Sequence, residues 1–268
     1  MKIALFSLLV AGANAFSAQV PQNMLSKASN LDGDGSWDPE KISKTVARIE
    51  GQTRKTWKFS DITQEVVQVA IRSDGRPVHV ETNLWIGPDW TPMKLKAYSE
   101  DGLKRPVQML LGTRNKQATI EVLNTGQWEM PVQASCNYAS SPLSEARFDL
   151  PNDPEVQSQY VEGGGAVKSF LFDPEVEQVQ VLLHTNTRQL HAYVELLNAP
   201  NNIKQKVKTF TNNGLLNSLF IVFDTPGAGN VVRVQNLAPL EFPCIAYVLP
   251  TAKSGLGEGS EPVISSGM

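Results

Sequence analysis

The sequence predicts an all-β protein made of two tandem, duplicated β-sandwich domains with a pseudo-twofold relation, preceded by a short N-terminal helix. Three observations support this fold class. Short runs rich in β-branched and aromatic residues recur about every ten residues, as in sandwiches. Turn residues such as Gly, Asn and Asp separate these runs, and no helical pattern connects them. The second half of the chain then repeats the first at a constant offset.

The repeat is visible as identities in one register. Arg76 aligns with Arg188 and Pro88 with Pro200, in each case 112 residues later. The same offset relates Lys94 to Lys206, Lys96 to Lys208, Asn124 to Asn236 and Pro131 to Pro243. A period of this length is a domain rather than a solenoid unit.

Within each copy the strands are predicted from alternation and from apolar runs. In the first copy they cover residues 65–72, 78–86, 93–99, 107–112, 118–124 and 132–138. Two runs, at residues 109–111 and 219–223, are continuously apolar, so we expect those strands to be covered on both faces.

The repeat also predicts the domain organisation. We expect one sandwich over residues 56–138 and a second over residues 168–250, joined by a linker over 139–167 that is rich in Pro and Gly. The Gly- and Ser-rich tail, residues 251–268, is expected to be flexible by itself.

The helix is expected within residues 31–55. Asp38 can act as its N-cap, with Pro39 at the first helical position and an acidic residue after it. Apolar residues then follow at helical spacing, at Ile42, Val46 and Ile49. Gly51 can end the helix.

The first 30 residues resemble a targeting sequence. Residues 1–15 have a basic start, an apolar stretch and a small-x-small end, as in a signal peptide that is cleaved. Phe16 follows Ala15, and residues 16–30 contain no acidic residue, which resembles the bipartite plastid presequence of diatoms and related algae. The prediction is removal of residues 1–15 and a plastid location, with secretion as the simpler alternative.

Composition excludes several classes of function. The 268 residues contain 24 Lys and Arg against 27 Asp and Glu, a net charge of −3 that does not support nucleic-acid binding. The longest apolar run is too short to span a bilayer. Two cysteines and three histidines do not support a disulfide framework or a His-based metal centre. Nucleotide-binding, zinc-protease and serine-hydrolase motifs are absent, so we assign no catalytic, cofactor-binding or metal-binding residue.

The remaining titratable residues of interest have simple structural interpretations. His79 and His191 are equivalent in the two copies and are interpreted as strand histidines. Cys136 and Cys244 lie near the ends of the copies; they are interpreted as small buried hydrophobes, with an inter-domain disulfide as the alternative.

Candidate assembly contacts come from the repeated lysines, one tryptophan and the tail. The lysines form a basic stripe, which is typical of a solvated edge strand or of a docking surface. Trp90 follows a Gly-Pro-Asp turn, where it can be exposed and contact another subunit. The candidate residues are Lys94, Lys96, Lys206, Lys208, Trp90, Pro262, Val263 and Ile264.

Several strings of this sequence resemble the diatom pyrenoid shell protein (PyShell) family. They are the Ala15/Phe16 junction, Glu-Val-Val-Gln-Val at 65–69, Glu-Val-Glu-Gln-Val at 175–179, Gly-Pro-Asp-Trp at 87–90 and Gly-Gln-Trp-Glu-Met-Pro at 126–131. The resemblance covers about residues 55–250.

The resemblance implies a structural, non-enzymatic protein without a cofactor. It implies self-assembly into an extended sheet or tube around the Rubisco matrix, at the pyrenoid periphery in the chloroplast stroma, where it supports CO2 concentration and fixation. The implied partners are other copies of the chain, with the Rubisco matrix or paralogous shell proteins as further candidates.

Two other classes of function are open on the sequence alone. One is a monomeric tandem β-sandwich module that binds a carbohydrate or protein ligand in a secretory or plastid compartment. The other is an enzyme without a recognisable motif. Particle size separates the shell from the module, and titratable residues converging in a pocket would indicate an enzyme.

Overall fold

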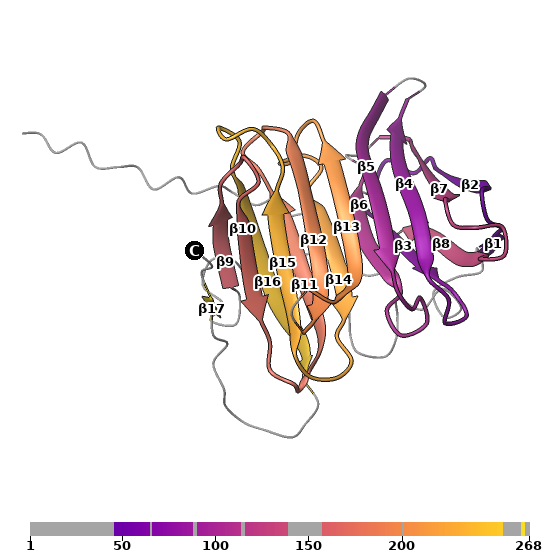
Figure 1. Cartoon of the computed structure of the whole chain (residues 1–268). Helices are drawn as coiled ribbons and strands as arrows, with labels where there is room; N and C mark the ends of the chain where they lie inside the picture. Colours follow the sequence, from indigo (N-terminus) through magenta and orange to yellow (C-terminus); the bar gives the residue numbers. More distant parts are fainter. Residues whose placement is uncertain are drawn as a thin grey trace, which may run out of the picture.

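Two β-sheets packed face to face make up the molecule (Figure 1). The computed structural model describes residues 46–64, 66–87, 90–113, 116–138, 157–199, 201–253 and 264–265. The eight-stranded sheet has the order β1-β8-β3-β6-β14-β11-β16-β9, and the nine-stranded sheet has the order β17-β10-β15-β12-β13-β5-β4-β7-β2. Every recorded strand pairing is antiparallel.

The strands of the first half are β1 (Ala47–Ile49), β2 (Arg54–Phe59), β3 (Val66–Arg72), β4 (Val78–Ile86), β5 (Trp90–Ser99), β6 (Val107–Gly112), β7 (Ala118–Asn124) and β8 (Val132–Tyr138). Those of the second half are β9 (Gln157–Val161), β10 (Val167–Leu171), β11 (Val176–His184), β12 (Leu190–Asn198), β13 (Ile203–Thr211), β14 (Leu219–Asp224), β15 (Asn230–Asn236) and β16 (Cys244–Lys253), followed by β17 (Ile264–Ser265). All six strands expected in the first copy are present at or close to their predicted bounds.

The two halves have the same strand order and meet at a seam in the centre of each sheet. β5 pairs with β13, and β6 pairs with β14. In the first pair Lys96 lies opposite Lys208, and in the second Met109 lies opposite Ile221. The residues of each of these pairs are 112 positions apart, so a pseudo-twofold axis passes through the same point of both sheets. The halves therefore form one continuous sandwich joined by backbone hydrogen bonds, rather than two sandwiches joined only by a linker.

The core lies between the sheets and takes alternate residues from each strand. The central strands of the eight-stranded sheet are buried on both faces, which confirms the prediction made from the apolar runs. Outside the core, that sheet carries further apolar side chains that are at most 2% exposed: Leu110, Leu182, Phe220, Val222 and Leu249. The outer face of the nine-stranded sheet is instead lined by Lys, Arg and Glu.

The expected helix and linker are partly wrong. Residues 47–49, in the last turn of the expected helix, form strand β1, and residues 38–45 lie outside the described part of the chain. Ile49 is 2% exposed in the core, and the backbone of β1 pairs with the free edge of β8, which a helix could not do. Residues 157–161, expected in the linker, form β9 and pair with β16 for the same reason.

Both cysteines are buried and free. Burial raises the pKa of the Cys244 thiol to about 12 and raises the pKa of Cys136 well above its ordinary value. The interpretation as small buried hydrophobes therefore applies, and the alternative of a disulfide does not.

The seam predicts a coupled pair of core residues. Met109 and Ile221 are fully buried and opposite one another, so replacing either by Ala should lower the free energy of unfolding by about 2–5 kcal/mol. Because the two side chains share one site, the double variant should depart from additivity in urea unfolding. Leu103→Ala, at a side chain that is 59% exposed, is the control and should change stability by less than about 0.5 kcal/mol. Additive losses at the seam would contradict the pairing.

Candidate assembly surfaces

The four repeated lysines lie on the outer face of the nine-stranded sheet, in β5 and β13. Lys94 and Lys96 alternate with buried Leu95, and Lys206 and Lys208 flank buried Val207. These strands pair with each other at the seam, so neither is at an edge. The interpretation of the stripe as a protected edge strand is therefore wrong.

Carboxylates neutralise part of this lysine stripe. The Nζ of Lys96 lies 2.5 Å from a carboxylate oxygen of Glu81. The carboxylate of Glu195 lies 2.8 Å from the Nζ of Lys206 and 2.6 Å from the guanidinium of Arg233. The Lys206 ammonium also lies 3.8 Å from the centre of the Tyr193 ring, a cation–π contact. The stripe is thus a mixed-charge network centred on the seam.

Glu195 is the most enclosed member of that network. Its side chain is 6% exposed, whereas those of Lys206 and Arg233 are 34% and 29% exposed. Burial by itself would raise the pKa of Glu195, but hydrogen bonds from Lys206 and Arg233 outweigh it, and the pKa is lowered. The carboxylate therefore stays ionised and holds the cations of β13 and β15 together.

The other predicted contacts are dispersed over the molecule. Trp90 is 38% exposed, at the start of β5. Ile264 lies in β17, which pairs with β10 and places Ile264 opposite Phe170. Pro262, Val263 and the Ala15/Phe16 targeting junction lie outside the described residues.

Two exposed apolar loop tips were not predicted from the sequence. Trp128 is 72% exposed in the loop between β7 and β8, and Leu240 is 67% exposed in the loop between β15 and β16. These residues are 112 positions apart, so they occupy equivalent places in the two halves. The signal was present as a large apolar residue at matching positions of two turn segments.

Both tips stand on the same rigid support. The side-chain amide of Asn124 donates to the carbonyls of Ile49 and Met130 and accepts from the amide of Gly126. Its counterpart Asn236 makes the equivalent three bonds, to Val161, Phe242 and Ala238. Each asparagine is fully buried, so its hydrogen bonds are shielded from water and hold the loop in place.

A glycine under each loop completes the support. A Cβ at Gly51 would lie 2.1 Å from the carbonyl oxygen of Gln127, and one at Gly163 would lie 1.8 Å from that of Pro239. Such contacts are too close for any side chain, so the close approach of the backbones requires glycine at both positions. The tips are therefore fixed features of the surface.

The tips belong to opposite flanks of the molecule. β1, β2, β7 and β8 form one flank, and β9, β10 and β17 form the other (Figure 1). The Trp128 loop joins β7 to β8, each next to a terminal strand of its sheet, and the Leu240 loop is placed equivalently on the other side. One chain therefore presents an apolar tip at each end of its long direction.

The described residues contain no group of three or more His, Cys, Asp and Glu side chains placed to hold a metal ion. His79 and His191 contact aromatic rings of their neighbouring strands, Tyr98 and Phe210, as strand histidines do. Over the same residues no helix is long and apolar enough to cross a membrane.

In a comparison with known protein families, residues 37–250 match the family described as diatom pyrenoid shell protein. A search of curated proteins gives no match. The match covers more than half of the chain and includes both halves of the sandwich.

Solved structures resemble the chain only distantly. The PBSX exported protein XepA has 8% identity and a TM-score of 0.26, over 76% of this chain and 84% of that one. A CBM22 tandem domain from Paenibacillus barcinonensis Xyn10C has 9% identity and a TM-score of 0.24, over 77% and 85% of the two chains. Vicilin from tomato has 8% identity and a TM-score of 0.19, over 76% and 73%. TM-scores this low carry no information about function. The function is therefore inferred from the family and from the surfaces of the chain itself.

The ion-pair network predicts a pH-dependent effect of Glu195→Gln. Because the folded-state pKa of Glu195 is lowered, its stabilisation is fully present above the unfolded-state value and is lost as pH falls through the folded-state value. The variant should be less stable than the natural protein by about 1–2 kcal/mol at pH 7, and the difference should shrink below about pH 4. Urea unfolding across this range measures it. A pH-independent loss in the Glu195 variant would contradict the assignment.

Proposed function

The chain belongs to the diatom pyrenoid shell protein family, and from this we propose that it is a structural protein that assembles with its own copies into a sheet- or tube-like shell. The family supports a role in the pyrenoid shell and an association with the pyrenoid of the chloroplast. The finer proposal is a shell in the stroma at the pyrenoid periphery, around the Rubisco matrix, that supports CO2 concentration and fixation. In this proposal the chain contributes surfaces rather than catalysis.

The observation that carries the assembly proposal is the pair of equivalent apolar tips on opposite flanks. A chain with two similar joining surfaces can bind a neighbour on each side. If the contacts do not close into a ring, repetition gives an open array. Because of the internal pseudo-twofold, one polypeptide presents two equivalent joining surfaces, as an isologous dimer does. No dimerisation step is then needed before the array grows.

Approximate free energies indicate how many contacts a joint between two chains needs. Burying an aromatic side chain removes about 150–250 Å² from water, which at about 25 cal/mol per Å² stabilises a joint by roughly 4–6 kcal/mol. Fixing two molecules relative to each other costs about 4–15 kcal/mol. One tip is therefore marginal, whereas two tips with edge-strand contacts, repeated over several neighbours, are sufficient.

The outer face of the nine-stranded sheet carries the mixed-charge network around Glu195. In a layer built from molecules in one orientation, this network would lie on one side of the layer.

Replacing both loop tips tests whether they form the joints between chains. The full chain should form sheets or tubes in negative-stain electron microscopy, and Trp128→Ser with Leu240→Ser should shift it to single particles of 29.4 kDa in sedimentation. Its melting transition should stay within a few degrees, because both side chains are exposed.

Leu103→Ser, which also changes a largely exposed apolar side chain, is the matched control and should leave assembly intact. A double variant that assembles as well as the natural chain would remove the tips from the joints. A natural chain that remains monomeric at high concentration would favour the monomeric binding module instead.

A second prediction concerns the C-terminal tail. Deleting residues 254–268 leaves β16 complete but removes β17 and the apolar residues beside it. We expect weaker assembly with an unchanged melting transition, because the deletion removes the candidate contacts Pro262, Val263 and Ile264, while β17 adds only two residues to the sheet. Equal assembly by the truncated chain would show that the joints lie on the sandwich alone.

A further inference from the structure

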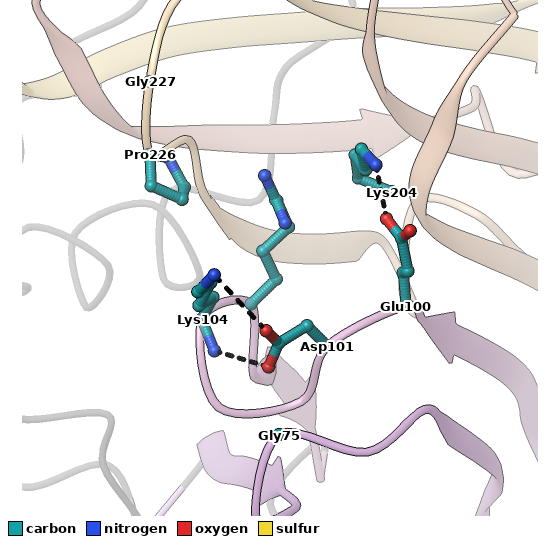
Figure 2. A pocket seen from close by; sticks show the side chains of 8 residues that line it. Gly75, Glu100, Asp101, Lys104, Lys204, Pro226 and Gly227 are labelled. Carbon is teal, nitrogen blue, oxygen red and sulfur yellow. Dashed lines mark hydrogen bonds and ion pairs between the residues drawn. The ribbon is translucent and has the colours of Figure 1, made fainter.

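A polar pocket of about 630 Å³ opens at one end of the seam between the two halves. Its walls come from the β3–β4 turn at Gly75, the β5–β6 loop, the start of β13 and the β14–β15 turn at Pro226 and Gly227. Figure 2 shows the lining residues, with Glu100 beside Lys204 and Asp101 beside Lys104. The pocket exists only because the two halves meet edge to edge.

Cations outnumber anions among the side chains that line the pocket. Lys104, Arg105 and Lys204 face Glu100 and Asp101. The ammonium of Lys204 lies 2.6 Å from Glu100, and that of Lys104 lies 3.9 Å from Asp101. These two pairs leave the guanidinium of Arg105 as the cation without a carboxylate among the lining residues.

Arg105 is buried yet lacks an acceptor. The residue is 8% exposed, and no residue that the structure describes accepts a hydrogen bond from its Nε. The nearby Asp224 interacts with it electrostatically, but the two oxygens of that carboxylate accept bonds from the amides of Gln108 and Gln178. A buried donor of a charged group without a partner is costly, so a shift of this side chain toward an acceptor on a ligand would remove a penalty as well as add a bond.

The second half of the chain shows that the fold does not need these charges. At the positions 112 residues away, Lys104 is replaced by Leu216, Arg105 by Asn217 and Lys204 by Pro92. The turn itself is the same: Asp101 accepts from the amides two and three residues later, and Asn213 does so in the second half. The cationic cluster therefore occurs at only one of the two equivalent ends of the seam, beside a turn that folds without it.

The backbone around Arg105 is held in place before any ligand binds. The Ser99 hydroxyl donates to the Arg105 carbonyl at 2.7 Å, and the Arg105 amide donates to Asp101 at 2.9 Å. Two hydrogen bonds cross between the halves. The side-chain amide of Gln205 donates to the carbonyl of Pro106 at 3.0 Å, and the backbone amide of Glu100 donates to the carbonyl of Lys204 at 2.9 Å. The seam thus fixes the backbone that carries the three cations, which lowers the ordering cost of binding.

We propose that this pocket binds a phosphate group, either of inorganic phosphate or of a phosphorylated small molecule. The planar guanidinium of Arg105 matches the geometry of a phosphate, and the ammonium groups of the two lysines are point charges that can add further bonds. The exposed side chain of Lys104, 70% accessible, can turn from Asp101 toward the ligand. The pocket is wide enough to take a small organic group next to the phosphate. This site is independent of assembly, so it stands or falls separately from the shell.

Equilibrium dialysis of the full chain against radiolabelled inorganic phosphate, at constant ionic strength, tests the proposal in both assembled and monomeric protein. We expect saturable binding of one phosphate per chain. Arg105→Asn, which installs the residue found at the equivalent position of the second half, should weaken it at least tenfold. Lys204→Gln should weaken it severalfold. Lys208→Gln, which removes a like charge from the same strand outside the pocket, should bind as the natural chain does.

Competition with glycerol 3-phosphate and with glycerol distinguishes the two sources of the phosphate group. Displacement by glycerol 3-phosphate at lower concentration than by phosphate indicates a phosphorylated small molecule, and the reverse order indicates inorganic phosphate. Glycerol alone should not compete. Non-saturable binding, or equal binding by the Arg105, Lys204 and Lys208 variants, would overturn the site. Should Arg105→Asn fail to fold, Arg105→Lys, which keeps the charge and loses the fork, must still bind more weakly than the natural chain.

Discussion

Antiparallel backbone pairing across the seam is the constraint on which the rest of the structure depends. β5 with β13, and β6 with β14, convert two copies of one unit into a single sandwich whose sheets run from flank to flank. Because equivalent residues lie opposite each other in both pairs, the arrangement is that of an isologous dimer within one chain. Pairing these strands with each other also removes two edges from each sheet that would otherwise be open to other chains.

The seam has different consequences at the centre and at the flanks. At the centre it places lysines from both halves side by side, and Glu81 and Glu195 balance part of their charge. At the flanks it leaves equivalent loops facing outward, each fixed by a buried asparagine and a glycine. The same symmetry that closes the middle of the molecule thus duplicates the surfaces at its ends, which is what a repeating layer requires.

The two halves are alike at the supports of the loop tips and differ at the pocket. The supports of the two tips are kept residue by residue, from Asn124 and Asn236 to Gly51 and Gly163. The pocket beside Arg105 has no charged counterpart, since Asn217 and Leu216 stand where the first half has cations. The supports of the tips are thus present in both copies, whereas the cations of the pocket occur at only one end of the seam.

The sequence by itself determined the fold class, most strand bounds and the 112-residue correspondence, because each of these follows from local signals. Alternation and turn residues mark strands such as Val78–Ile86, and continuous apolar runs mark those buried on both sides. The short strands β1, β2 and β9 were missed for the same reason, as was β17 in the tail that was expected to be flexible. Two to six residues carry too little periodicity, and Val46 and Ile49 also fit a helix.

Only the tertiary structure decided which strands meet across the halves, and with them the nature of every surface. From the sequence alone, Lys96 and Lys208 fit a solvated edge strand as well as a docking surface. The structure places them opposite each other in the middle of a sheet. The exposure of Trp128 and the burial of Arg105 likewise depend on neighbours far away in the chain. Pairing between strands more than a hundred residues apart leaves no mark on local spacing, because a strand sequence specifies which of its faces is buried and not which strand lies beside it.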